Sequence, residues 1–249
     1  MVRRGTVAVL VLLSLSGCKR GPNYVLVTGG RADVVNSDVP ADDSVEAQIG
    51  VEHWVYETRR EETYRYRFDA WGGGNALGPS GLLRLEAESG VAPRFSHNQH
   101  WYLRGGAAAE LERNSANGLS LLELPVVTGG YQLHHPSQDT PWHIEVGPRL
   151  GLGLAGVAVA GDERARLGFA PEAGVAGAVL YQFIALELRA FRAFEDPAMD
   201  VFQGSLCVGF LFGACLDQRT IVADFRGVRE KSYVLGITVG AGIVHAATR

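Results

Sequence analysis

Residues 142–158 read WHIEVGPRLGLGLAGVA, and their side chains alternate between two kinds. One set of alternate positions is apolar: Trp142, Ile144, Val146, Pro148, Leu150, Leu152 and Leu154. The set between them is polar, charged or glycine: His143, Glu145, Gly147, Arg149, Gly151 and Gly153. Successive side chains of a β-strand point to opposite faces. The stretch therefore predicts a strand with one apolar face and one face of small or polar groups.

The same alternation recurs along the chain from about residue 48 onward. Glycine is abundant, at 32 of 249 residues, and helical periodicity is almost absent, which together favour an all-β fold. We predict an antiparallel, up-and-down barrel of about eight to ten strands. Its candidate strands are 48–57, 63–71, 80–88, 100–112, 119–132, 142–158, 165–179, 182–194, 201–216 and 232–246.

The composition of the second face separates a membrane barrel from a soluble one. A soluble barrel hides its apolar face and shows water a polar one, whereas a membrane barrel shows lipid its apolar face. Here the second face is rich in glycine with scattered Arg and Glu, and lysine occurs only at positions 19 and 231. We therefore expect a membrane barrel. The alternative is a periplasm-facing soluble β-barrel that binds an apolar ligand.

The N-terminus carries the features of an exported, lipid-anchored protein. Arg3 and Arg4 precede an uncharged stretch over 5–17, which is shorter than a membrane-spanning helix and fits a secretory signal. Leu15-Ser16-Gly17-Cys18 resembles the lipobox of bacterial lipoproteins. That resemblance implies cleavage before Cys18, lipid on Cys18 and, because Lys19 follows instead of Asp, sorting to the outer membrane.

Three segments follow from these patterns: a lipoprotein signal peptide over 1–17, the lipidated Cys18 with a polar tether to residue 47, and a barrel over 48–249. Within the barrel, residues 122–127 (LELPVV) and 143–148 (HIEVGP) resemble the middle of small porin-like outer-membrane barrels. The resemblance implies that the partners are outer-membrane lipids and the machineries for barrel assembly and lipoprotein sorting. One departure is the end of the chain, which lacks the terminal aromatic residue common in that family.

Connection lengths predict which end of the barrel faces the periplasm. With both termini on the periplasmic side, the short connections 72–79, 113–118, 159–164 and 195–200 would be periplasmic. The longer connections 89–99, 133–141 and 217–231 would then be external.

Eight charged residues fall on the predicted inner face, and we expect them to form an ion network that fills a narrow lumen. The interior of a barrel of this size is filled by side chains or holds little more, and buried ions need partners. The expected product is a stable, largely closed barrel. The eight residues are Arg104, Glu110, Glu123, Glu145, Arg149, Glu172, Glu187 and Arg189.

No other cluster in the sequence predicts chemistry. Five histidines fall on or beside predicted external loops, at 97, 100, 134, 135 and 143, and match no defined metal site, so we expect solvated loop residues and no cofactor. The set His135, Ser137 and Glu145 is similar to that of outer-membrane lipid A deacylases, but the surrounding motif is missing. We therefore expect no enzyme. A net charge of −4 does not favour nucleic acid.

Two cysteines lie eight residues apart in the predicted strand 201–216. In one extended strand that separation is about 26 Å, far beyond disulfide reach. We therefore expect Cys207 and Cys215 to be free, small lumen residues, although a hairpin turn near Gly213 would bring them together. The function that these observations favour is structural or surface-contact work in the outer membrane, with no known protein partner.

Overall fold

The structure is a computed structural model. It describes residues 23–37, 44–59, 61–96, 98–114, 117–135, 142–159, 166–193, 198–225 and 228–245. These residues form thirteen β-strands and no helix. Among them, no helix is long and apolar enough to cross a membrane.

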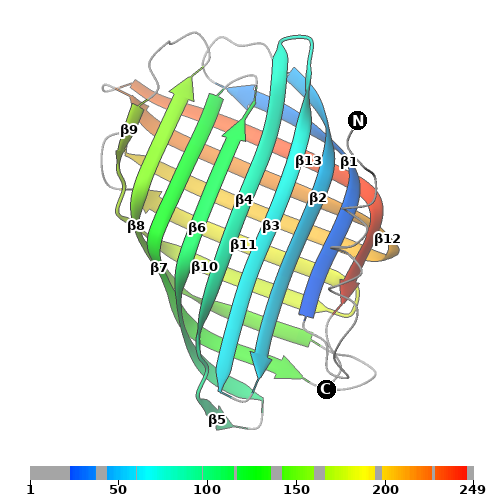
Figure 1. Cartoon of the computed structure of the whole chain (residues 1–249), viewed down its shortest axis with the longest axis vertical. Helices are drawn as coiled ribbons and strands as arrows, with labels where there is room; N and C mark the ends of the chain where they lie inside the picture. Colours follow the sequence, from blue (N-terminus) through cyan, green and yellow to red (C-terminus); the bar gives the residue numbers. More distant parts are fainter. Residues whose placement is uncertain are drawn as a thin grey trace, which may run out of the picture.

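The strands follow one another up and down around a barrel (Figure 1). Their bounds are β1 Asn23–Ser37, β2 Ser44–Arg59, β3 Glu62–Asn75, β4 Gly78–Val91, β5 Arg94–Ser96, β6 Gln99–Arg113, β7 Asn117–His135, β8 Trp142–Val159, β9 Arg166–Phe169, β10 Glu172–Tyr181, β11 Ile184–Ala193, β12 Met199–Phe225 and β13 Val228–His245.

The wall is a closed ring of antiparallel pairs. β1 pairs with both β2 and β13, and β8 pairs with β10, so eleven elements form the ring while the short β5 and β9 lie beside it. An odd number of strands cannot close a ring in which every neighbour is antiparallel, because direction alternates from strand to strand. One element must therefore cross the wall twice.

That element is β12, which folds back on itself. Residues 199–208 pair with β11, and residues 210–225 pair with β13. The turn lies at 209–213: a Cβ at Gly209 would sit 2.8 Å from the Cα of Gly213, and Leu211 has φ of 78°. The two arms make twelve crossings of the wall. The prediction of an antiparallel, up-and-down barrel is confirmed, with eleven strand elements in the ring where about eight to ten were expected. The prediction of a single strand over 201–216 is wrong.

The first strand was also missed. Residues 23–37, which we assigned to a solvated tether over 18–47, form β1, and β2 already begins at Ser44. β1 closes the barrel through fourteen register pairs with β13. Its inner face carries Arg31 and Asp33 next to Gly29-Gly30, so the middle of the strand looks polar and turn-like in the sequence.

Because β1 was not predicted, each later strand runs in the direction opposite to the one expected from the sequence. Both ends of the barrel chain, Asn23 and His245, lie at one rim, together with the connections after β2, β4, β7 and β10. We call this the terminus rim, and the opposite one, which holds the β3–β4 turn, the loop rim (Figure 1). The connections 89–99 and 133–141, expected opposite to the termini, lie on the terminus rim.

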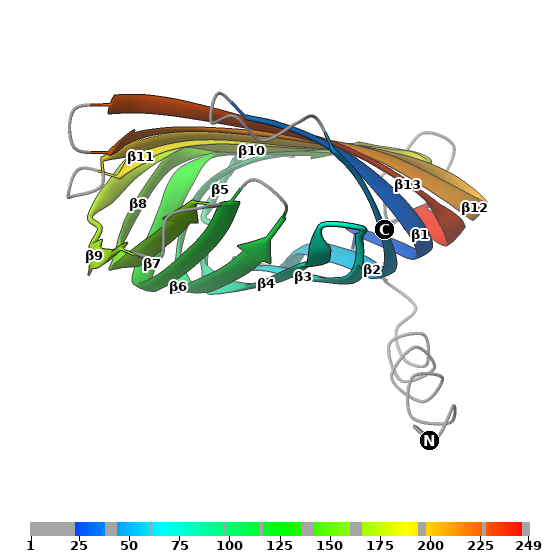
Figure 2. The same cartoon turned by 90° about the horizontal axis from the view of Figure 1, so that it is seen from above.

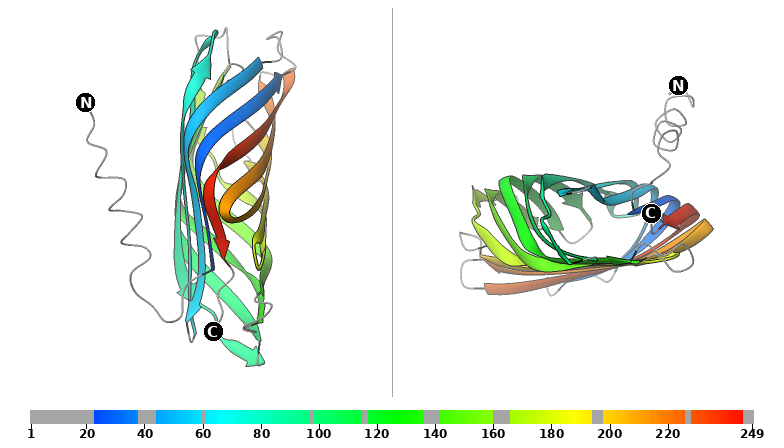
Figure 3. Two further views of the ribbon diagram at one scale, coloured as in Figure 1. Left: turned by 90° about the vertical axis from the view of Figure 1, so that its right-hand side faces the viewer. Right: turned by 90° about the horizontal axis from the view of Figure 1, so that it is seen from below.

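The barrel is flattened in cross-section. Viewed along its length, a curved wall of β2 to β8 faces a flatter wall of β10 to β13 (Figures 2 and 3). Side chains from the two walls therefore meet across the lumen, as the Tyr56 hydroxyl of β2 does when it donates to Glu187 of β11 at 2.7 Å.

The outer face of the wall is apolar. On β8 the outward side chains Ile144, Val146, Leu150, Leu152 and Leu154 are 36–55% exposed. The ten residue steps from 144 to 154 span roughly 33 Å along the strand, or about 25 Å along the barrel at the usual ~40° tilt. That is the height of the apolar band on outer-membrane barrels.

Aromatic side chains border this band near the terminus rim. The rings of Phe95, Trp101 and Tyr131 lie 5.6–5.8 Å apart, and Phe183 packs against Phe210 at 5.0 Å. Phe95 and Trp101 are about half exposed. Aromatic girdles of this kind lie at the interfaces of a membrane.

Candidate functional site: the barrel interior

The interior of the barrel contains a charged belt between two apolar ends. At the terminus rim, a buried apolar cluster contains Val25, Val27, Trp54, Tyr56, Ala178, Leu180, Ala185, Cys207, Cys215 and Val244. Near the loop rim a second cluster contains Leu121, Ala155, Ala170, Phe191, Ala193, Met199, Val201 and Ile221. This arrangement, with charge inside and hydrocarbon outside, is the opposite of a soluble barrel. An apolar ligand chamber, the alternative left open by the sequence, is not what the lumen forms.

The centre of the belt joins the two walls. Arg65 and Arg67 of β3 both reach across the lumen to the carboxylate of Glu187 on β11. Arg67 also binds Glu52 and Asp69, at 2.8 and 2.7 Å. These side chains are at most 7% exposed. Ion pairs in so dry a setting are screened little by salt and hold the two walls together.

The eight charged residues singled out from the sequence all lie in this interior, between 0 and 6% exposed. Arg149 on β8 holds Glu123 at 2.5 Å and Glu172 at 2.7 Å. Arg104 binds Glu145 at 2.6 Å, and Arg189 binds Glu86 at 2.9 Å and Glu123 at 3.2 Å. Glu110 forms ion pairs with Arg84 at 3.0 Å and with Arg219 at 2.8 Å.

Twelve further members of the belt were not predicted from the sequence. The signal was present in β3 and β4, where charges alternate with aromatic or aliphatic residues in RYRFD over 65–69 and RLEAE over 84–88. In β1 and β12 no such contrast exists. The missed residues are Arg31, Asp33, Glu46, Glu52, Arg65, Arg67, Asp69, Arg84, Glu86, Glu88, Asp217 and Arg219.

Two small cavities lie among the described side chains of the belt. A cavity of about 30 Å³ lies between Arg31, Arg84, Arg219 and Asp217, and another of about 10 Å³ lies beside Tyr102. A single water needs roughly 10–15 Å³ by the same measure. The two cavities therefore hold a few waters at most, which is too little for a hydrated solute.

Two of the histidines are lumen residues, so the expectation of solvated loop histidines is wrong for them. His100 is 3% exposed, with its Nδ1 2.9 Å from the carbonyl oxygen of Ala92. His143 is 2% exposed, and its Nε2 lies 3.2 Å from Glu145. His97 and Ser137 lie outside the described residues, and so do the side chains of His134 and His135.

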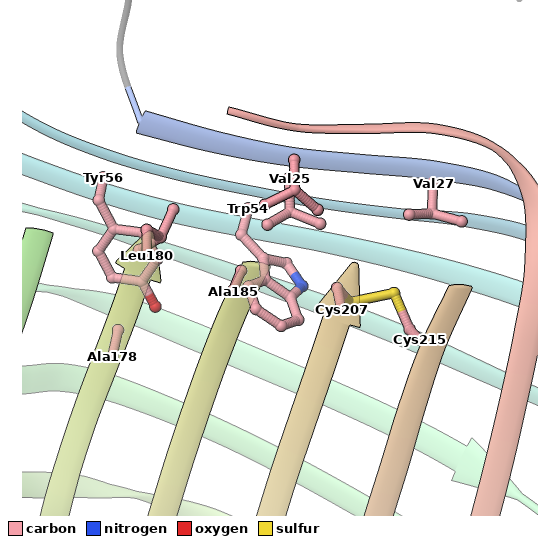
Figure 4. Packing of buried hydrophobic residues seen from close by; sticks show 10 residues of the cluster. Val25, Val27, Trp54, Tyr56, Ala178, Leu180, Ala185, Cys207 and Cys215 are labelled. Atoms are coloured by element: carbon pink, nitrogen blue, oxygen red, sulfur yellow. A yellow bond between two sulfur atoms is a disulfide. The ribbon is translucent and has the colours of Figure 1, made fainter. Parts of the chain in front are cut away.

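Cys207 and Cys215 are joined by a disulfide, so the expectation of free thiols is wrong. Their Cα atoms are 4.1 Å apart. Figure 4 shows the bond between two adjacent arms, with Trp54 and Val25 close by. The sulfurs lie in the lumen, where both cysteines are at most 1% exposed. The turn at 209–213 is what brings them within reach, because side chains in one extended strand would be far apart.

An apolar band outside, aromatic residues at its edge and a charged, filled interior define a membrane β-barrel protein. No family model matches the sequence, and no curated protein matches it. Among solved structures the chain is similar to the NanC porin (13% identity, TM-score 0.35, covering 85% of this chain and 98% of that one). It is also similar to the transport unit of the autotransporter AIDA-I from Escherichia coli (10%, 0.37, 94% and 97%). A third similarity is to LpxR from Salmonella typhimurium (10%, 0.36, 87% and 99%).

Proposed function

We propose that the chain is an outer-membrane lipoprotein whose barrel is closed and non-conducting and serves a structural or surface-contact role without catalysis. The observation that carries this proposal is the filled lumen. Charged side chains from both walls pair across it, and apolar clusters lie towards each rim. Opening such a barrel to solutes would require separating several buried ion pairs, each costly to break.

The lipid anchor would lie at the terminus rim. Only five residue steps separate Cys18 from Asn23, where β1 begins. Fully extended, that segment spans at most about 18 Å. The lipid on Cys18 would therefore enter the leaflet beside the barrel, because residues 23–37 of the expected tether form β1.

Conductance in a planar bilayer tests the closed state. The purified chain, inserted into a bilayer, is expected to give no stepwise current, while a general porin in the same chamber does. Replacing Arg65, Arg67 and Glu187 together by alanine removes the central cross-lumen group and should produce steps. Stepwise current from the unchanged protein would overturn the proposal.

Fractionation tests the anchor separately. Outer membranes are washed with carbonate or urea, and the protein is run on a gel unheated and boiled. A Cys18→Ala variant that stays in the membrane and still migrates as a compact band until boiled would mean that the barrel itself is integral. Release of that variant into the soluble fraction, without a band shift, would reject the membrane barrel.

A further inference from the structure

A second kind of site lies in the terminus-rim half of the lumen. The two sulfurs of Cys207 and Cys215 and a carboxylate oxygen of Glu52 all lie within 4.8 Å of one another. The three side chains are 0–1% exposed. Two thiolates with a carboxylate are a ligand set that zinc accepts, because thiolate sulfur and carboxylate oxygen are both ligands for this ion.

Two buried oxygens of the same part of the lumen lack a hydrogen-bond partner among the described residues. Glu52 accepts a hydrogen bond from Arg67 at 2.8 Å through Oε1, but its Oε2 is buried without a hydrogen-bond partner among the described residues. Thr238 is the cross-strand neighbour of Cys215, and its fully buried hydroxyl is likewise unpartnered. Each unsatisfied buried oxygen costs about 1–3 kcal/mol, so a cation at this point would satisfy groups that protein donors do not.

We propose that the reduced forms of Cys207 and Cys215, together with Glu52, bind one divalent transition-metal ion of the zinc class. The disulfide and the metal are then alternative states of one site. A dithiol reduces the disulfide by giving two electrons and two protons, and is itself oxidised to a disulfide. Binding of the ion then releases the two thiol protons, because thiolate is the ligand.

The bound ion offsets most of the charge that its ligands bring into the lumen. Two thiolates and one carboxylate contribute −3 and the ion contributes +2, while the guanidinium of Arg67, which also binds Asp69 and Glu187, lies against the same carboxylate. The remaining negative charge therefore lies beside a cation in a dry interior, where an unpaired charge is costly. Because the sulfurs are buried in the finished barrel, the ion has to enter during assembly, before the two arms of β12 are oxidised.

Cobalt provides the test, since sulfur ligands give Co²⁺ a charge-transfer absorbance in the near ultraviolet. The full chain is reduced by a dithiol in urea, freed of the dithiol, and refolded without oxygen into detergent with Co²⁺. The expected result is one Co²⁺ per chain with the sulfur band, displaced by Zn²⁺, and no binding to the oxidised barrel. A folded, reduced barrel without the band would overturn the proposal.

Three variants assign the ligands. Cys215→Ser should lose the sulfur-dependent site, and it removes no charge that the belt needs for folding. Glu52→Gln should weaken Co²⁺ binding at least tenfold, whereas Asp69→Asn, which alters the cross-strand neighbour of Glu52 in β3, should not. Compact migration on an unheated gel confirms that each variant is folded. Equal affinity for Glu52→Gln and the unchanged chain would remove Glu52 from the site and overturn the three-ligand proposal.

Discussion

Arg149 has no exposed surface, and its guanidinium binds two carboxylates from two other strands, Glu123 and Glu172. We predict that Arg149→Met destabilises the barrel by about 3–5 kcal/mol, because it leaves buried carboxylates with too few partners. The measurement is the urea concentration at which the compact gel band is lost. The control is Arg192→Met, since the side chain of Arg192 is 58% exposed and reaches Asp200 only at 3.7 Å.

The free energy of unfolding of Arg192→Met should lie within about 1 kcal/mol of that of the unchanged chain, because exposed ion pairs contribute little. If the two substitutions had the same effect, the buried ion pairs would not be what stabilises the barrel. A hydrated lumen would then be the better description, and the closed-barrel proposal would lose its basis.

At the scale of a single element, β12 depends on a glycine. A Cβ at position 209 would lie 2.8 Å from the Cα of Gly213, so only glycine lets the two arms approach. We predict that Gly209→Val prevents or strongly weakens folding, measured by the fraction of protein that migrates as a compact band after refolding. Gly204→Val is the matched control on the same strand, because a Cβ there would meet the flexible end of Leu188 at 3.2 Å and no backbone atom closer than 4.0 Å. Equal refolding yields would reject the hairpin.

The lipid-facing side of the strands gives a depth-dependent prediction. Leu150 lies at the middle of β8 and is 55% exposed, whereas Val91 is the last residue of β4 and is 54% exposed. An arginine on the lipid face costs roughly 2–4 kcal/mol at the midplane and 0–1 near the interface. Leu150→Arg should therefore lower the unfolding free energy in lipid vesicles by at least 2 kcal/mol more than Val91→Arg. Equal costs would mean that no membrane midplane lies at Leu150.

The fold class was predictable from strands such as β8, where a leucine face opposes glycine and charge. Most of the barrel follows from that contrast, and the lumen charges follow from the face opposite to the leucines. β1 escaped because the contrast fails there, and the turn within β12 escaped because the contrast continues through it. Arg31 and Asp33 give β1 the polarity of a loop, while the apolar residues 210–212 continue the pattern of β12 through its turn.

Pairing across the lumen could not be predicted at all from one strand at a time. The cross-lumen pairs Arg65–Glu187 and Arg189–Glu86 join residues that are 122 and 103 positions apart along the chain, and they meet only because the barrel is flattened. Likewise, the disulfide forms because the chain turns back at 209–213, and the alternation of apolar and small side chains does not reveal that turn. The face on which a side chain lies follows from the local sequence of its strand. Its ion-pair partner across the lumen follows only from the closed barrel.

For the molecule as a whole, the number of strands determines at which rim the chain ends. Twelve crossings return the chain to the rim where it began, so Asn23 and His245 lie together. With the termini on the periplasmic side, the loop rim faces the exterior. In that orientation the connections after β4 and β7, which were expected to be external, would be periplasmic, because the expectation began the barrel one strand too late.

Labelling of intact cells checks this orientation. In a Cys207→Ser/Cys215→Ser background, one cysteine is placed at Leu77, 71% exposed in the β3–β4 turn of the loop rim. A second variant places it at Glu61, an exposed residue between β2 and β3 at the terminus rim. A membrane-impermeant maleimide should label position 77 on whole cells, and position 61 only after the outer membrane is permeabilised. The reverse pattern would place the terminus rim outside. Labelling of both on whole cells would mean that the barrel does not separate two compartments.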